Sequence, residues 1–291
     1  MSGTPTNRTT IGLPAEISSE ILAKTQEASA VMRLARRIDL PGRGVEIPVI
    51  TSDPAAAWVS ETGEKPVSNP GLTKKIMSAY KLAVIVPFSN EFRRDAAALY
   101  DELVRRLPLA LARKFDETVI GGTAPGSNFD VLKNCTAYDI ETSTYTNLVA
   151  ADAEIAAAGG ELNGFALSPQ GKSVMLGAVD KNDRPLFLNS AIEGMGNQIL
   201  GAPVEISKGA YVAGATDDIV GAVGDWTQAV YGTVEGVKVD FSSDATLIDA
   251  SNQAINLFQQ NMFAVRAEIE IGFRADTDCF ALLTKDAESE S

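Results

Sequence analysis

Histidine is absent from the 291 residues of this chain. It is the side chain whose unperturbed pKa lies nearest neutrality, the base in Ser-His-Asp and Cys-His catalysis, and a common zinc ligand. Its absence excludes these catalytic arrangements and histidine-based zinc sites. Carboxylates, lysines, tyrosines and cysteines remain as reactive groups, so an enzyme that uses carboxylates is the catalytic alternative that stays open.

The two cysteines, Cys135 and Cys279, are far apart in the sequence and lack metal-ligand spacing. Two cysteines do not make a disulfide framework, and small buried thiols commonly serve as packing residues. We therefore interpret both as structural. The sequence predicts no catalytic residue, no metal site and no cofactor.

The segment 166–173, ALSPQGKS, nearly matches a phosphate-binding loop, with alanine in place of the first glycine. Such a loop needs a flexible anion-binding turn between a strand and a helix. Here Ser168 and Pro169 have the pattern of a helix start, which places Lys172 in the first turn, pointing to solvent. The helix start is the stronger interpretation, and we predict no nucleotide site.

Two groups of charged residues lie on segments that we expect to be exposed. The first, Glu61, Glu64 and Lys65, lies in a stretch rich in proline and glycine, where an active site, a salt bridge between subunits and plain solvated charge are the alternatives. The second consists of arginine pairs on a predicted helix, where pairing between subunits, or within the helix with nearby acidic residues, is favoured over a nucleic-acid surface. Tryptophans are common packing anchors at interfaces. The candidate contacts between subunits are therefore Trp58, Glu61, Glu64, Lys65, Arg93, Arg94, Arg105 and Arg106.

A long hairpin is predicted to carry the first group. Residues 44–50 alternate as a strand, and Pro48 places that strand at a sheet edge. Residues 51–72 hold several prolines and glycines and indicate a long excursion, after which 73–88 return as a strand. Because so long a hairpin is barely stable alone, it must lie on another surface.

An N-terminal arm precedes the hairpin. Residues 1–13 are polar and rich in glycine and proline, and 14–24 have the pattern of a short helix with Pro14 in its first turn. Such an arm has little to pack on locally. We expect it to lie along a neighbouring subunit or along its own body.

The strongest helix pattern covers residues 89–120. Ser89 or Asn90 can cap it, Gly121 ends it, and Pro108 is expected to kink it. One apolar stripe repeats every four residues: Leu99, Leu103, Leu107, Leu111, Phe115 and Val119. The remaining predicted elements are helices at 147–158, 168–179 and 251–261, and strands at 164–167, within 204–240 and within 262–284.

The net charge of −13 predicts no general affinity for nucleic acid, because lysines and arginines supply that affinity. No apolar run reaches the length of a transmembrane helix, and the N-terminus lacks the apolar segment of a secretory signal. We therefore expect folding in the cytoplasm, without a membrane partner.

With these elements in order, the chain resembles the HK97-type major capsid proteins of tailed bacteriophages over nearly its whole length. The resemblance is carried by AAAWVSETGEKPVS (55–68), LAVIVPFSNEFRRDA (82–96), GFALSPQ (164–170), RPLF (184–187), GAPVEIS (201–207), GDW (224–226) and NLFQQNMFAVRAEIEIGFRADTDCFALLT (256–284). Each block alone is weak, and their order and spacing make the match specific.

The resemblance implies an α+β fold: an N-terminal arm (1–43), an extended loop formed by the long hairpin (44–88), a peripheral domain with a spine helix (89–140 and 229–291) and an axial domain (141–228). It implies a structural protein, not an enzyme.

The same resemblance implies self-assembly into hexamers and pentamers that close an icosahedral shell around double-stranded DNA. That DNA is enclosed without sequence-specific binding. The expected location is the virion, after assembly in the bacterial cytoplasm. Expected partners are further copies of the chain, a separate scaffolding protein, a portal and decoration proteins. A family cross-link between a loop lysine and an asparagine is not carried over, because no asparagine and glutamate match. The alternative is an encapsulin-like shell that encloses protein cargo.

Overall fold

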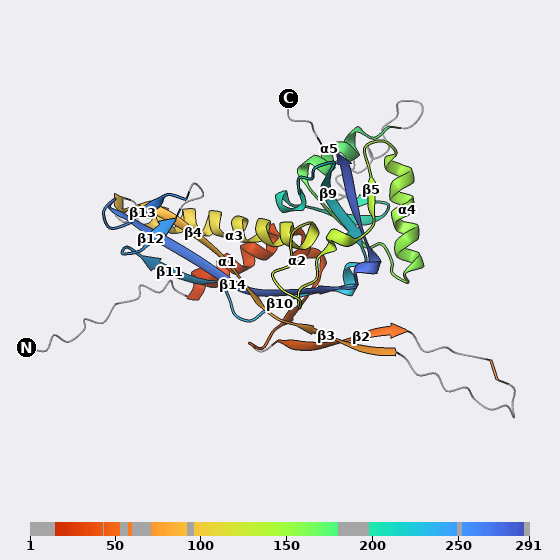
Figure 1. Cartoon of the computed structure of the whole chain (residues 1–291), viewed down its shortest axis with the longest axis horizontal. Helices are drawn as coiled ribbons and strands as arrows, with labels where there is room; N and C mark the ends of the chain where they lie inside the picture. Colours follow the sequence, from red (N-terminus) through yellow and green to blue (C-terminus); the bar gives the residue numbers. More distant parts are fainter. Residues whose placement is uncertain are drawn as a thin grey trace, which may run out of the picture.

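The structure is a computed structural model, and it describes residues 15–42, 44–52, 58–59, 71–91, 96–179, 198–248 and 252–287. Figure 1 shows two bodies, each built on a sheet, and a separate hairpin that leaves the molecule near the place where the two bodies meet. The fold is mixed α+β. Among the described helices, none combines the length and apolarity needed to cross a membrane.

The first body is a five-stranded sheet with the long helix α3 (Ala96–Ile120) packed against it. Strand β14 is its centre, because β4 pairs with one side of β14 and β10 and β11 pair with the other. The remaining elements of this body are α1 (Ala15–Ala28), α2 (Ala30–Leu34), β1 (Arg36–Asp39), β4 (Tyr80–Ser89), β10 (Ala229–Thr233), β11 (Lys238–Ser242) and β14 (Met262–Ala275).

Helix α3 confirms the predicted apolar stripe. Leu103, Leu107 and Leu111 are buried among residues of β14, while farther along the helix Phe115 packs in the core shared by both bodies. Pro108 lies inside the helix, and the helix ends before Gly121 as expected. Residues 92–95, at the predicted helix start, lie outside the described residues, so the cap at 89–90 stays a prediction; Ser89 Oγ accepts from the Glu91 N–H at 3.4 Å.

The second body is a six-stranded sheet with α4 (Thr144–Ala157) and α5 (Pro169–Gly177) packed on it. Its strand order is β5-β15-β9-β6-β8-β7. The strands are β5 (Ala137–Asp139), β6 (Gly164–Leu167), β7 (Gln198–Ile199), β8 (Ala202–Ile206), β9 (Asp217–Gly224) and β15 (Phe280–Asp286). The predicted helix start at Ser168 is confirmed, since its Oγ accepts from the Gly171 N–H at 3.0 Å.

The chain passes from one sheet into the other between β14 and β15, and an aromatic core fills the junction. Phe115 of α3 lies edge-on to Phe129 and Phe273, and Trp226 lies edge-on to Phe280 at 5.1 Å. All five are buried in one cluster, so the bodies share a core. The 3-10 turns are η2 (Leu132–Asn134), η3 (Lys208–Ala210), η4 (Trp226–Gln228) and η5 (Thr277–Cys279).

Two predictions of secondary structure are wrong. The expected helix at 251–261 is instead strand β13 (Ala254–Asn256), paired with β12 (Thr246–Ile248), followed by a turn. The backbone at Asn252 and Asn261 is left-handed, with φ of 60° and 54°, and a right-handed helix cannot contain such residues.

The expected single strand at 73–88 is two strands. Residues up to Met77 belong to β3 (Gly71–Met77) and pair with β2 (Val45–Ser52), whereas β4 starts at Tyr80 and pairs with β14. The break at 78–79 is needed because the chain leaves one sheet and enters another.

Candidate assembly site

The hairpin of β2 and β3 is a two-stranded sheet that is separate from the sheets of both bodies. Its strands pair from Val45 opposite Met77 to Ser52 opposite Gly71, and no other described strand joins them. Lys74 of β3 donates to Glu46 of β2 at 2.8 Å, and this hydrogen bond raises the pKa of the lysine. Exposed cross-strand ion pairs stabilise a hairpin only slightly, so its orientation must be fixed elsewhere.

The base of the hairpin is buried in the first body. Met77, the last residue of β3, is fully buried against Leu40 and Val230. This apolar contact holds the end of β3 against β10, while the rest of the hairpin extends away from the body, as Figure 1 shows.

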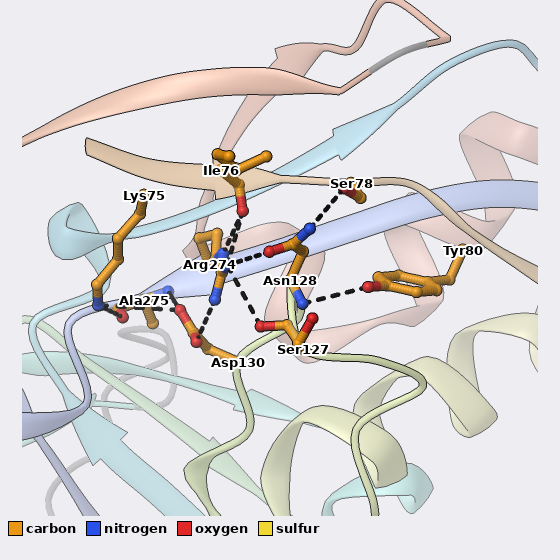
Figure 2. A network of polar contacts seen from close by, with 9 residues as sticks. All are labelled: Lys75, Ile76, Ser78, Tyr80, Ser127, Asn128, Asp130, Arg274 and Ala275. Carbon is orange, nitrogen blue, oxygen red and sulfur yellow. Dashed lines mark hydrogen bonds and ion pairs between the residues drawn. The ribbon is translucent and has the colours of Figure 1, made fainter.

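Arg274, near the end of β14, is the centre of a polar network that also grips this base (Figure 2). Its Nε and one Nη donate to the carbonyl oxygen of Ile76 at 2.9 and 2.7 Å. The other Nη donates to Asp130 Oδ1 at 2.6 Å. The arginine side chain is only 12% exposed and that of Asp130 20%. A planar guanidinium holds several acceptors at fixed angles, so it defines the direction of β3.

Asn128, in the loop after α3, also forms hydrogen bonds with the base of the hairpin. Its side-chain nitrogen donates to Ser78 Oγ at 3.1 Å, and its backbone N–H donates to the Tyr80 hydroxyl at 3.2 Å. Its side-chain oxygen accepts from Arg274 at 3.2 Å. Asn128 thus binds Ser78 within the break between β3 and β4, Tyr80 at the start of β4, and the arginine (Figure 2).

Asp130 receives a second set of donors from the same place. Its Oδ2 accepts from the Ala275 N–H at 3.2 Å and lies 4.0 Å from Lys75 Nζ, which donates to the Ala275 carbonyl at 3.1 Å. One carboxylate therefore faces two cations, Arg274 and Lys75. The negative charge of Asp130 is thus compensated inside the network, as a partly buried carboxylate requires.

The sequence analysis did not single out this network. Its members come from residues 75–80, 127–130 and 274–275, which are brought together only by the fold. The one local signal was a charged residue, Arg274, directly after the apolar run 271–273 of β14.

The candidate contacts named from the sequence are not brought together among the described residues. Trp58 is fully exposed, and Arg105 and Arg106 are exposed on α3. The other five, Glu61, Glu64, Lys65, Arg93 and Arg94, lie outside the described residues, as do the expected arm at 1–13 and the RPLF block.

The segment with the phosphate-loop pattern is closed to a ligand. Ser168 already uses the Gly171 N–H, and a Cβ at Gly171 would lie 2.6 Å from the Val220 carbonyl oxygen, so the backbone packs tightly there. Within the described ranges, no group of three or more cysteine, aspartate and glutamate side chains is placed to hold a metal ion.

The two cysteines are poor nucleophiles. Burial, with help from Asp278 and Glu154, raises the pKa of Cys135 to about 12, and burial also raises the pKa of Cys279. Both thiols are therefore protonated at neutral pH. Cys135 Sγ donates to the Thr277 carbonyl at 3.3 Å, which fits a structural role.

A cavity of about 350 Å³ lies beside Cys135. Glu154 on its wall already accepts from Thr136 at 2.6 Å and from the Tyr138 hydroxyl at 2.5 Å. Hydrogen bonds from Thr136 and, to a smaller extent, from Tyr138 lower the pKa of Glu154. The hydrogen bond to Glu154 raises the pKa of Tyr138 to about 12. The glutamate is thus held as an ionised hydrogen-bond acceptor, which is not the state of a general acid.

Comparison with known proteins identifies the type of protein that combines such a hairpin with two sheet bodies. The phage capsid family matches residues 10–282. This chain belongs to the phage capsid family. As a major capsid protein it is a structural subunit of the icosahedral shell of a tailed phage, it is located in the virion, and it is not an enzyme.

Individual relatives agree in sequence and in fold. The capsid protein is 30% identical to the "Probable major capsid protein gp17" of Mycobacterium phage L5, over 94% of this chain and 89% of the relative. A solved structure from Gordonia phage Cozz matches with a TM-score of 0.68 and 21% identity, over 89% of this chain and 87% of that one. One from Mycobacterium phage Bobi matches with 0.68 and 20% identity, over 99% and 96%. These relatives favour the phage capsid over the encapsulin-like alternative.

Proposed function

We propose that the capsid protein assembles as hexamers and pentamers that enclose double-stranded DNA. We also propose that its hairpin is the element that interlocks neighbouring subunits. The observation that carries this proposal is the anchored hairpin. A two-stranded hairpin is marginal alone, yet here its base is held by Met77 and Arg274 while the pair of strands has no other cover among the described residues. Cover from a neighbouring subunit would supply the packing that the described residues do not give this hairpin.

The polar network of Arg274, Asn128 and Asp130 at the hairpin base, called the anchor network below, gives the hairpin a defined direction before assembly. A segment already held in its bound orientation loses less conformational entropy on association. The Arg274 and Asp130 pair would therefore lower the cost of docking the hairpin on a neighbour. In this view the network serves assembly without touching the partner.

The proposed subdivision follows the two sheets. The N-terminal arm is 1–43 and the extended loop 44–88, with the peripheral domain at 89–140 and 229–291 and the axial domain at 141–228. Because β5 and β15 pair within the six-stranded sheet, we propose to move 137–139 and 280–286 from the peripheral domain to the axial domain.

The proposed subunit contacts are those named from the sequence: Trp58, Glu61, Glu64 and Lys65 between β2 and β3, Arg93 and Arg94 before α3 in the sequence, and Arg105 and Arg106 on α3. A scaffolding protein, a portal and decoration proteins are the proposed further partners. The net charge of −13 supports a container that holds DNA without binding it tightly.

Trp58 offers the sharpest test, because a fully exposed tryptophan contributes little to the isolated subunit. Assembly of wild type, Trp58→Ala and Trp58→Phe would be followed by light scattering and electron microscopy. We expect the alanine variant to raise the concentration needed for shell formation at least tenfold, with unchanged subunit unfolding, and phenylalanine to restore most of the assembly. Equal assembly of wild type and the alanine variant would remove Trp58 from the interface.

A further inference from the structure

A buried carboxylate lies where three separate parts of the capsid protein meet. Asp116 of α3 is completely buried. Ser29 Oγ donates to its Oδ1 at 2.5 Å, Ala30 N–H donates to Oδ2 at 3.0 Å, and Val31 N–H donates to Oδ1 at 3.3 Å. The Ser207 hydroxyl is a fourth donor.

The first three donors are the start of α2. Ser29 also accepts from the Met32 N–H at 3.1 Å, so the first three amides of this short helix are all paired, two of them with a side chain 85 or more residues away. The first amides of a helix have no partner within the helix. A helix of 5 residues capped by Asp116 therefore depends on α3 for its position.

The fourth donor belongs to the second body. Ser207 follows β8 and caps η3, where its Oγ accepts from the Gly209 N–H at 3.2 Å. A Cβ at Gly209 would lie 2.4 Å from the Arg113 carbonyl oxygen and 2.8 Å from Asp116 Cβ, so η3 packs directly on the α3 backbone. An ion pair between Arg33 of α2 and Glu205 of β8 joins the same two parts.

We infer that Asp116 is a positioning residue that fixes the N-terminal helical segment (15–34) and the η3 corner of the second body on α3. The inference concerns the subunit itself and goes beyond the proposed contacts between subunits. Each carboxyl oxygen accepts from a backbone N–H, of Ala30 or Val31, that cannot turn away as a hydroxyl can. A protonated carboxyl oxygen keeps acceptor capacity for such an N–H, whereas the NH₂ group of asparagine has none.

Protonation offers a readout that a merely space-filling residue would lack. Burial raises the pKa of Asp116 to about 6, although hydrogen bonds from its four donors act to lower it. Release of the segment would expose the carboxyl and return its pKa to 3.8, so the docked state binds the proton more tightly. Lowering the pH from 7 to 5 would therefore disfavour release by about tenfold.

The other charged groups on the elements packed around Asp116 are exposed or partly buried. Glu27 of α1, Arg33 of α2 and Lys208 of η3 are exposed. On α3 itself Arg113 and Lys114 are exposed and Glu117 is partly buried, and Glu205 of β8 is partly buried.

The test is hydrogen exchange of unassembled full-length subunits, read by mass spectrometry and corrected for intrinsic rates. Asp116→Asn keeps the volume but replaces one acceptor with an NH₂ group that faces a fixed N–H. Asp152→Asn, the same change at an exposed position of α4, is the matched control.

We expect at least tenfold faster exchange at 30–34 in Asp116→Asn, with unchanged exchange in β14 and in the control. Wild type should show about tenfold more protection at pH 5 than at pH 7 in this segment, and Asp116→Asn should show none of this change. Unchanged exchange at 30–34, or equally faster exchange throughout the subunit, would overturn the inference.

Ser207→Ala keeps three of the four hydrogen-bond donors to Asp116, and it tests the inference even if Asp116→Asn does not fold. We expect a threefold or larger increase in exchange confined to 30–34 and 207–210. No increase there would overturn the role given to the η3 corner.

Discussion

Replacing Arg274 with methionine should destabilise the subunit far more than an ordinary surface substitution. The variant loses two hydrogen bonds to the Ile76 carbonyl and the 2.6 Å bond to Asp130, and it leaves that carboxylate with the Ala275 N–H and Lys75. Breaking a buried ion pair costs about 3–5 kcal/mol. Because Asp130 is 20% exposed and keeps a nearby cation, we expect a loss of about 2–4 kcal/mol in the free energy of unfolding.

The assay is urea unfolding of unassembled subunits, with Arg266→Met as the matched control. Arg266 lies on the same strand and pairs with Asp240 at 2.8 Å, but both side chains are about half exposed, so its loss should cost less than about 1 kcal/mol. A lysine at 274 keeps the charge without the planar fork and should fall between wild type and the methionine variant.

A double-mutant cycle with Asp130→Asn isolates the pair. We expect a coupling energy of at least about 1 kcal/mol, since the two side chains share one network. The interpretation of Arg274 as the anchor fails if Arg274→Met costs no more than Arg266→Met, or if the two substitutions at 274 and 130 are additive.

Three further substitutions test other parts of the fold. Gly209→Ala should lower stability by about 2–4 kcal/mol, because its Cβ would overlap the Arg113 carbonyl; a thermal midpoint equal to wild type would show that η3 has room to move. Ser168→Ala should cost about 1 kcal/mol in urea unfolding through loss of the α5 cap, and a loss near zero would contradict that assignment. Between pH 7 and pH 5 the wild type should gain about 1–1.5 kcal/mol of stability relative to Asp116→Asn, because the pKa of Asp116 is raised from 3.8 to about 6 and its protonation favours the folded state. Parallel pH profiles of stability for the two proteins would refute this.

Local patterns predicted those elements whose burial follows a regular period. The four-residue spacing on α3 places Leu103, Leu107 and Leu111 in the core, and the alternation in β14 buries Val265 and Ile269. The start of α5 at Ser168 was equally predictable because the cap is a contact between near neighbours in sequence.

The helix expected at 251–261 failed because composition alone favoured it. Leu257 is fully buried while the adjacent Phe258 is 79% exposed, and two asparagines adopt left-handed backbone that only the turn geometry reveals. Pairing of β13 with β12 decides the segment, and that pairing is a tertiary feature.

The anchor network and the Asp116 junction were beyond reach for a related reason. Arg274 meets Asp130 across 144 residues, and Asp116 meets Ser29 across 87. No local spacing encodes such pairs, so only the folded arrangement reveals them.

The central claim, that this chain builds a closed shell, is tested most directly by electron microscopy of the purified protein assembled with the proposed scaffolding protein. We predict closed icosahedral particles tens of nanometres across, built from hexamers and pentamers. Uniform particles of one to a few subunits under the same conditions would contradict the account.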